Sequence, residues 1–351
     1  MKIPKFEAQT EWVKPTEFPD LRKVDEIAID LETKDPDLLK KGSGSVIGNG
    51  EVIGIAVATK FYKGYFPIAH EGGGNMDRSR VLSWLKDILE APSTKIFHNA
   101  IYDVCWLRAM GFKINGDIAC TMIASALTDE NRFRYDLNSL SWHYLGYGKN
   151  EAALAEAAEE WGIDPKSEMY KLPAMHVGAY AERDAEVTLG LWQEMKKEII
   201  NQDLEDIFDL ESDLFHCLVD MRFKGVRVDI ERAHAMKKEL ISLVEKLNIT
   251  DKVFFPGYIQ YDEIPIFYGL SSCFVLPSIT EQWGLVVNES LASGKPVIVS
   301  NRCGSAPNLV EDKDVGYTFD PYDESDLIAK MNLISREGNL EHFSKNTKTV
   351  I

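Results

Sequence analysis

The sequence predicts an α/β protein in two parts, a mixed sheet with flanking helices followed by a fragment with a parallel sheet. Three β-type segments come in succession near the start, and mainly helical patterns follow them. After about residue 248 short apolar runs alternate with helices, which is typical of parallel sheets. We therefore expect a lead-in at 1–23, a first domain at 24–204, a helical segment at 205–248 and a second α/β fragment at 249–351.

The first sheet begins with strands expected at 26–31, 51–58 and 62–68. Their order along the chain, with loops between them, predicts a β-meander. A helix is expected at 78–90, because Val81, Leu85, Ile88 and Leu89 fall on one helical face. A short strand at 95–98 and a helix at 100–110 that ends at Gly111 complete this region.

From Asp117 onward the pattern is mainly helical. The Ala/Glu-rich segment 151–160 predicts a solvated helix, and a long helical run is expected at 176–222. The segment 225–229 interrupts the helical pattern, and a further helix is expected at 230–247. Beyond it, the runs 253–255, 273–276, 296–299 and 316–319 predict strands of a parallel sheet.

The composition is that of a globular protein, with 45% hydrophobic and 27% charged residues among 351. The longest uncharged stretch, 264–279, is too short to span a bilayer, and the charged N-terminus does not resemble a signal peptide. We expect no membrane association and a cytoplasmic protein of a bacterial or phage-infected host. Five dispersed cysteines form no C-x-x-C pair, which argues against disulfides and zinc clusters.

The formal net charge of −17 argues against a nucleic-acid binder that works by non-specific charge attraction. It does not exclude an enzyme that holds nucleic acid through metal ions in a local groove. Asp30 and Glu32 lie two residues apart at a predicted strand end, so both carboxylates project from the same face. Their repulsion would raise a pKa unless a hard cation such as Mg²⁺ binds them. The ordinary alternative is a solvated strand end.

Two further pairs have helical spacing. Asn99 and Asp103 share a face if a helix starts near Asn99, although an N-cap Asn followed by a surface Asp is the simpler reading. Tyr180 and Asp184 also share a helical face, unless this tyrosine only borders the core of an amphipathic helix. The order of the three pairs on a strand, a helix start and a later helix favours one common site.

In these three pairs of residues the chain resembles the proofreading 3′→5′ exonuclease domain of family A DNA polymerases, the tyrosine variant of the DEDD superfamily. The resemblance covers about 24–230 and implies a ribonuclease H-like fold. Short motifs similar to those of the family also occur at 117–121 and 135–140. The resemblance further implies hydrolysis with two ions, Mg²⁺ or Mn²⁺. Asp30, Glu32 and Asp184 would bind the first ion and Asp103 the second, with Asp30 bridging both.

By the same resemblance, Tyr180 and Glu32 would orient the attacking water, and Asn99 and Tyr102 would contact the terminal nucleotides. The implied substrate is the 3′ end of single-stranded DNA. Whether the protein also acts together with a separate polymerase is left open. Stacking on a single strand needs no sequence readout. Segment 214–229 looks like the entry to a polymerase domain, but no palm carboxylate motif follows, so we expect no polymerase activity.

From about 249 to 351 the chain resembles the C-terminal half of the nucleotide-sugar-binding domain of GT-B retaining glycosyltransferases of family four. The resemblance rests on Glu281 and Glu289, on Gly284 and Leu285 between them, and on the segment 292–298. It implies that both glutamates contact the donor sugar nucleotide and that backbone N–H groups at Gly284 and Leu285 receive the diphosphate. The ordinary reading of the two glutamates is helix-end charge.

The acceptor domain and the first βαβ portion of that family are missing from this sequence. We therefore expect a partial Rossmann-like fragment without transferase activity. The chain then joins two unrelated families near 240–250, as a natural fusion or as an artefact. Three functions stay open: a metal-dependent exonuclease, a nucleotide-sugar-binding module, and an idle exonuclease scaffold that only binds DNA ends. A preference for DNA or RNA is open as well.

Overall fold

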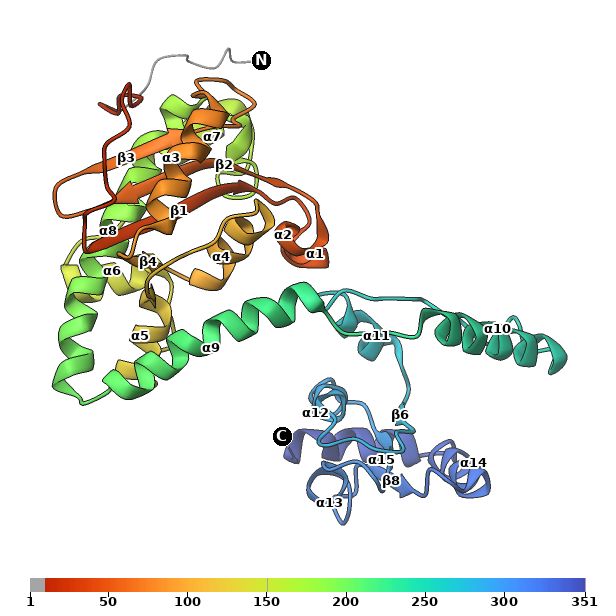
Figure 1. Cartoon of the computed structure of the whole chain (residues 1–351). Coiled ribbons are helices and arrows are strands. Elements are labelled where there is room, and N and C mark those ends of the chain that lie inside the picture. The colour runs from red at the N-terminus through yellow and green to blue at the C-terminus, as the bar shows by residue number, and fades with distance from the viewer. Residues whose placement is uncertain (1–9, 150, 351) are drawn as a thin grey trace. The chain divides into compact units, whose positions relative to one another are not determined.

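The computed structural model describes residues 10–149 and 151–350, so the first nine residues of the predicted lead-in lie outside it. The chain divides into two units, Met1–Val228 and Asp229–Ile351. Figure 1 shows the elements of both units. Within the described residues, no helix is long and apolar enough to cross a membrane.

The first unit is built on a mixed five-stranded sheet with the order β3-β2-β1-β4-β5. The first three strands pair antiparallel, which confirms the predicted meander. The last two strands run parallel to β1. The strands are β1 (Glu26–Lys34), β2 (Glu51–Ala58), β3 (Lys63–Pro67), β4 (Thr94–Phe97) and β5 (Ile118–Cys120).

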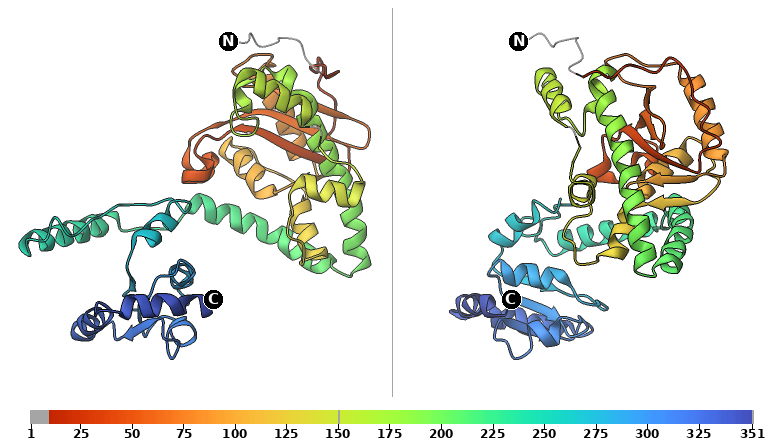
Figure 2. Two further views of the ribbon diagram at one scale, coloured as in Figure 1. Left: turned by 180° about the vertical axis from the view of Figure 1, so that it is seen from behind. Right: turned by 90° about the vertical axis from the view of Figure 1, so that its left-hand side faces the viewer.

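Helices cover both faces of this sheet, as Figure 2 shows for α3 on one face and α8 on the other. The predicted helix at 78–90 is confirmed as α3, and its Leu85 and Ile88 pack with Ile27 and Ile29 of β1. The helices of this unit are α1 (Leu38–Lys41), α2 (Gly44–Ile47), α3 (Arg78–Glu90), α4 (Ala100–Ala109), α5 (Thr121–Thr128), α6 (Leu137–Leu145), α7 (Ala152–Trp161), α8 (Ala174–Asn201) and α9 (Glu205–Lys224), with a 3₁₀ turn at Met169–Lys171.

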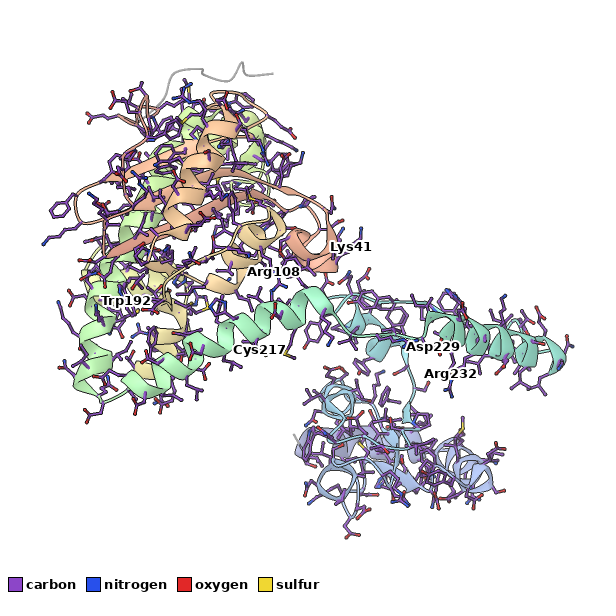
Figure 3. The ribbon with its side chains drawn as sticks, in the orientation of Figure 1. Lys41, Arg108, Trp192, Cys217, Asp229 and Arg232 are labelled. Carbon is purple, nitrogen blue, oxygen red and sulfur yellow. The ribbon has the colours of Figure 1, made fainter. Side chains whose placement is uncertain are left out.

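The longest helix, α8, crosses the other face, where the sheet presents small side chains. Ala28 and Ala56 of the sheet belong to the same buried cluster as Ala181 and Ala185 of α8. Small residues on both surfaces bring the helix backbone near β1. Trp192, labelled in Figure 3, donates a hydrogen bond from Nε1 to Glu26 at the start of β1 (3.0 Å).

The continuous helical run predicted at 176–222 is wrong, because α8 ends at Asn201 and α9 starts at Glu205. Asp203 between them has a φ of 55°, which a helix does not permit. After this turn α9 packs back on the sheet through Phe215 and Val219. Arg108 of α4, labelled in Figure 3, pairs with Asp220 of α9.

The second unit contains a parallel three-stranded sheet with the order β6-β7-β8, as the alternating pattern predicts. The strand predicted at 253–255 is wrong: this segment forms no strand, and the side chains of Phe254 and Phe255 are exposed. Asp229 caps α10 by accepting a hydrogen bond from the N–H of Arg232, and both residues are labelled in Figure 3. The elements are α10 (Ile230–Lys246), α11 (Ile264–Leu270), β6 (Phe274–Leu276), α12 (Leu285–Ala292), β7 (Val297–Ser300), α13 (Ala306–Leu309), β8 (Gly316–Phe319), α14 (Glu324–Ile334) and α15 (Asn339–Asn346), with a 3₁₀ turn at Thr347–Thr349.

Candidate functional site

Strand β1 places two carboxylates on the face that α8 covers. Its side chains alternate, so Ile29 and Leu31 enter the core beside α3 while Asp30 and Glu32 point to the opposite face. The register of β1 against β2 shifts between Glu32 and Thr33, which marks a bulge directly after the second carboxylate. Bulges of this kind re-aim side chains next to functional sites.

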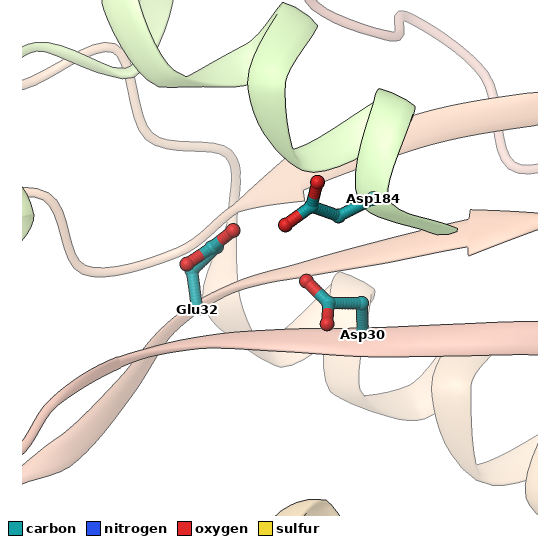
Figure 4. A group of neighbouring side chains, drawn as sticks. All are labelled: Asp30, Glu32 and Asp184. Carbon is teal, nitrogen blue, oxygen red and sulfur yellow. The ribbon is translucent and has the colours of Figure 1, made fainter. Parts of the chain in front are cut away.

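Asp184 of α8 completes a cluster with these two residues, and Figure 4 shows the three carboxyl groups directed toward one another. One oxygen from each of Asp30, Glu32 and Asp184 lies within 4.8 Å of the other two. Only 9% of Glu32 and 3% of Asp184 is exposed to solvent. A strand and a helix more than 150 residues apart in sequence thus bring together two buried carboxyl groups and the half-buried carboxyl group of Asp30.

Two of the carboxylate oxygens in this cluster are buried and have no hydrogen-bond partner among the described residues, Oε1 of Glu32 and Oδ1 of Asp184. Buried carboxylate oxygens are costly unless a donor or a cation satisfies them. Hard divalent cations take oxygen ligands of this type. The donor set and its unsatisfied oxygens therefore fit a divalent metal ion held by Asp30, Glu32 and Asp184.

The cluster shifts the ionisation of its members. Burial, and then the charge of Asp184, raises the pKa of Asp30 to about 7. Burial raises the pKa of Glu32 well above its usual range, and the charges of Asp30 and Asp184 add to this effect. Burial also raises the pKa of Asp184, although Lys149 opposes that shift. Without a cation, these acids therefore resist ionising together.

Lys149 is a member of the site that the sequence reasoning missed. Its Nζ lies 2.5 Å from Oδ2 of Asp184 and 3.3 Å from the hydroxyl of Tyr180. Burial alone would lower the pKa of Lys149, but the carboxylates around it raise the pKa on balance. Lys149 follows α6 in a loop without helical or strand periodicity. It is one of several basic residues between Asp103 and Tyr180, so no signal in the sequence distinguishes it.

Asp103 of α4 lies beside the cluster but does not belong to the group of three. Its Oδ1 accepts a hydrogen bond from the N–H of Leu31 (3.0 Å), the residue between Asp30 and Glu32. The side chain is buried, with 4% of the residue exposed. Burial, and then the charge of Asp30, raises its pKa well above the usual range. The structure therefore places Asp103 against the backbone of β1, within electrostatic reach of Asp30.

The three remaining residues of the predicted site are Tyr180, Asn99 and Tyr102, and the structure brings Tyr180 next to Asp184 and Lys149. Tyr180 is on α8 one turn before Asp184, and the ammonium of Lys149 lies 5.2 Å from its ring centroid. Asn99 precedes α4 with a φ of 59° and is exposed, and its side chain makes no capping hydrogen bond. The hydroxyl of Tyr102 is 2.7 Å from Oγ1 of Thr33 and donates to Asp35 (3.0 Å), which ties α4 to the end of β1.

In the second unit, the four residues singled out from the sequence lie at or near the start of α12. Gly284 precedes the helix with a φ of 83°, and a Cβ built on it would lie 3.2 Å from Cγ of Glu281. Leu285 is the first helical residue and is exposed. Glu289 lies further along the helix, where Oε2 accepts a hydrogen bond from Tyr268 (3.0 Å).

Two family descriptions match this chain. Residues 17–200 match the family described as 3′-5′ exonuclease, and residues 218–350 match the family described as Glycosyl transferases group 1. The first match covers more than half of the chain and includes the whole carboxylate cluster.

The individual relatives are of two kinds, DNA polymerases and glycosyltransferases. The chain is 33% identical over 323 residues to a DNA-directed DNA polymerase of Pseudomonas phage M6. The aligned region covers 86% of this chain and 46% of that protein. It therefore spans less than half the length of that relative. The sulfoquinovosyl transferase SQD2 of Arabidopsis thaliana is 36% identical over 94 residues, which is 26% of this chain and 18% of that protein.

Among solved structures, NrnC of Brucella melitensis with bound Mg²⁺ superposes with a TM-score of 0.41 at 17% identity. The superposition covers 59% of this chain and 89% of that one. A C-terminal segment similar to glycosyltransferases follows the N-terminal unit that carries the acidic cluster. Because the match to the exonuclease family covers more than half of the chain, the chain belongs to the 3′-5′ exonuclease family.

Proposed function

We propose that this protein is a metal-dependent 3′→5′ exonuclease that hydrolyses the terminal phosphodiester of single-stranded DNA, as proofreading nucleases do. The observation that carries the proposal is the buried cluster of Asp30, Glu32 and Asp184, whose oxygens lie within 4.8 Å of one another in a member of the exonuclease family. Within the part of the chain that the structure describes, two of its carboxylate oxygens have no hydrogen-bond partner, which suits them as ligands of a cation.

In this proposal Asp30, Glu32 and Asp184 hold one ion, and Asp30 and Asp103 hold a second. Mg²⁺ or Mn²⁺ would activate water and stabilise the charge that develops on the phosphate and on the departing 3′ oxygen. The position of Asp103 against the N–H of Leu31 supports its part, because that hydrogen bond fixes one oxygen of the carboxylate beside Asp30.

The other residues of the site orient the reactants. Tyr180 and Glu32 flank Asp184 and are proposed to orient the attacking water. Asn99 and Tyr102 lie at the start of α4 and are proposed to contact the terminal nucleotides. The hydrogen bonds of Tyr102 to Thr33 and Asp35 hold its ring in place, which suits stacking against a base without sequence preference.

The test is digestion of a 5′-labelled single strand by the full chain with Mg²⁺ or Mn²⁺. We expect a ladder that shortens from the 3′ end, and no digestion in EDTA. Asp30→Asn and Asp103→Asn should each abolish the ladder, whereas Asp87→Asn on the exposed surface of α3 should leave it unchanged. Digestion in EDTA, or early release of the 5′ label, would contradict the proposal. A matching RNA strand establishes which nucleic acid is preferred.

The second unit supports a separate candidate function, binding of a nucleotide sugar without transfer. The observation that favours it is the placement of Glu281 beside Gly284 at the start of α12, where helix N–H groups can receive a diphosphate. A nucleoside diphosphate sugar at millimolar concentration should then raise the melting temperature of the full chain. Glu289→Gln should reduce that increase, and no increase in the unmodified protein removes the candidate.

A further inference from the structure

Lys149 places a positive charge inside the acidic cluster. Only 15% of its side chain is exposed, and its ammonium contacts Oδ2 of Asp184 at 2.5 Å. The same ammonium is 3.3 Å from the hydroxyl of Tyr180. The backbone N–H of Lys149 donates to Oδ1 of Asn138 on α6 (3.1 Å), which anchors the loop that carries it.

The two oxygens of Asp184 have different surroundings. Oδ2 is bonded to Lys149, whereas Oδ1, like Oε1 of Glu32, is buried and finds no hydrogen-bond partner in residues 10–149 and 151–350. One ammonium group therefore leaves part of the cluster unsatisfied. Three carboxylates and one lysine keep an excess of negative charge if all are ionised, so the cluster attracts a further cation.

A divalent ion bound at Oδ1 of Asp184 would lie close to the ammonium group that contacts Oδ2 of the same carboxylate. The repulsion between the two cations is strong in a largely buried site, so binding of the ion favours departure of the ammonium. The flexible four-carbon stem of lysine lets the ammonium leave Asp184 while the backbone stays in place. The ring of Tyr180, 5.2 Å away, gives the displaced charge an aromatic face nearby.

We propose that Lys149 is the internal counter-ion of the carboxylate cluster and that a divalent ion must displace its ammonium from Asp184 in order to bind. The inference rests on the proposed function, because it takes Asp30, Glu32 and Asp184 as the metal ligands. Lys149 then stabilises the metal-free protein and weakens metal binding. It is a positioning residue that sets the metal concentration at which the site fills.

The test compares the full-length protein with Lys149→Gln, which removes the charge and keeps much of the length. We expect Mn²⁺ to bind this variant at least tenfold more tightly in isothermal titration calorimetry. The variant should also melt at a lower temperature than the unmodified protein in EDTA, and saturating Mn²⁺ should remove that difference. A purely structural lysine would lower the melting temperature equally in both conditions and leave Mn²⁺ affinity unchanged.

Lys63→Gln is the matched control. Lys63 also pairs with a carboxylate of α8, Oε2 of Glu186 at 3.1 Å, but lies outside the cluster. Its loss should leave Mn²⁺ affinity unchanged. Equal or weaker Mn²⁺ binding by Lys149→Gln overturns the inference while leaving the proposed function intact. Failure of the unmodified protein to bind Mn²⁺ at all overturns the proposed function instead.

A measurement on the unmodified sequence keeps the inference testable if Lys149→Gln does not fold. In protein labelled with ¹⁵N-lysine, the Nζ resonance of Lys149 is assigned by its absence from Lys149→Arg. Addition of Mg²⁺ should move this resonance, because the ammonium loses its contact with Asp184. A Lys149 resonance that stays in place while Mg²⁺ binds shows that no displacement occurs, and the inference is then wrong.

Discussion

Replacing Glu32 by Gln should stabilise the metal-free protein and remove most of its response to metal. Glu32 takes part in two of the three carboxylate pairs in the cluster, and its ligand oxygen lies within 4.8 Å of those of Asp30 and Asp184. At an effective dielectric constant of about 20, two unit charges at that distance repel by about 3.5 kcal/mol. The amide keeps the size of the side chain and can donate to either neighbouring carboxylate.

Only part of this repulsion will be measured, because the cluster already relieves some of it. Burial and the neighbouring charges raise the pKa of Glu32 well above its usual range, so the cluster can bind a proton instead of holding every charge. We expect a net gain of about 1 kcal/mol at neutral pH in EDTA. For a unit of this size such a gain corresponds to an increase in melting temperature of roughly 2–4 °C.

Metal should stabilise the unmodified protein far more than Glu32→Gln. At 100 times its dissociation constant, a ligand that binds only the folded state stabilises it by about 2.7 kcal/mol. The unmodified protein should then melt roughly 5–11 °C higher in Mn²⁺ than in EDTA, whereas Glu32→Gln should show little of this shift. Thermal denaturation followed by circular dichroism measures the melting temperatures of both proteins in EDTA and in Mn²⁺, and Glu194→Gln on α8 is the control. A variant that melts lower in EDTA and keeps the full Mn²⁺ shift would refute the reasoning.

Three further predictions concern groups outside the cluster. Burial lowers the pKa of His70 to about 4. As the pH falls from 6.5 to 4, the imidazole therefore takes up a proton in the unfolded chain before it does so in the folded protein. The free energy of unfolding measured by urea denaturation should drop by about 3 kcal/mol through this group. Lys95→Met should lower stability by about 3 kcal/mol in the same assay, because the buried ammonium donates to three backbone carbonyls. Gly284→Ala should destabilise the second unit by about 2 kcal/mol and speed its proteolysis, since a Cβ would lie 2.8 Å from Sγ of Cys303 at a φ of 83°.

Each of these predictions has its own control. His70→Gln should lose that share of the pH dependence, and an unchanged pH profile in the variant would show that His70 contributes nothing. Lys86→Met removes an exposed lysine of α3 and should leave the urea midpoint in place; an equal effect of both lysines would contradict the account of Lys95. Gly294 has a φ of 75° but open space around it, so Gly294→Ala should be milder than Gly284→Ala.

The sequence predicted the elements whose pattern is local. The alternation in β1 put Asp30 and Glu32 on one face with Leu31 on the other, and the apolar spacing of 78–90 matched α3. Both patterns reflect burial of one side of an element, which the order of residues encodes directly. That Asp184 faces the two carboxylates of β1 was inferred only from the resemblance to a family, because no local pattern joins residues so distant in sequence.

Features that depend on tertiary packing escaped the sequence reasoning. Lys149 has no periodic neighbours, and only the folded chain brings it to Asp184. The turn at Asp203 contains neither Gly nor Pro, so the helical pattern continues through it while the backbone does not. The apolar run 253–255 has the composition of a strand but pairs with no strand in the described part of the chain.

The measurement that tests the central claim most directly is the release of the terminal nucleotide from a 3′-labelled single strand as a function of Mg²⁺ concentration. The account predicts that the full chain liberates labelled nucleoside monophosphate only when metal is present, and that Asp184→Asn liberates none while remaining folded. Release that continues in EDTA, or release by Asp184→Asn at the rate of the unmodified protein, would contradict the assignment of this cluster as the catalytic centre.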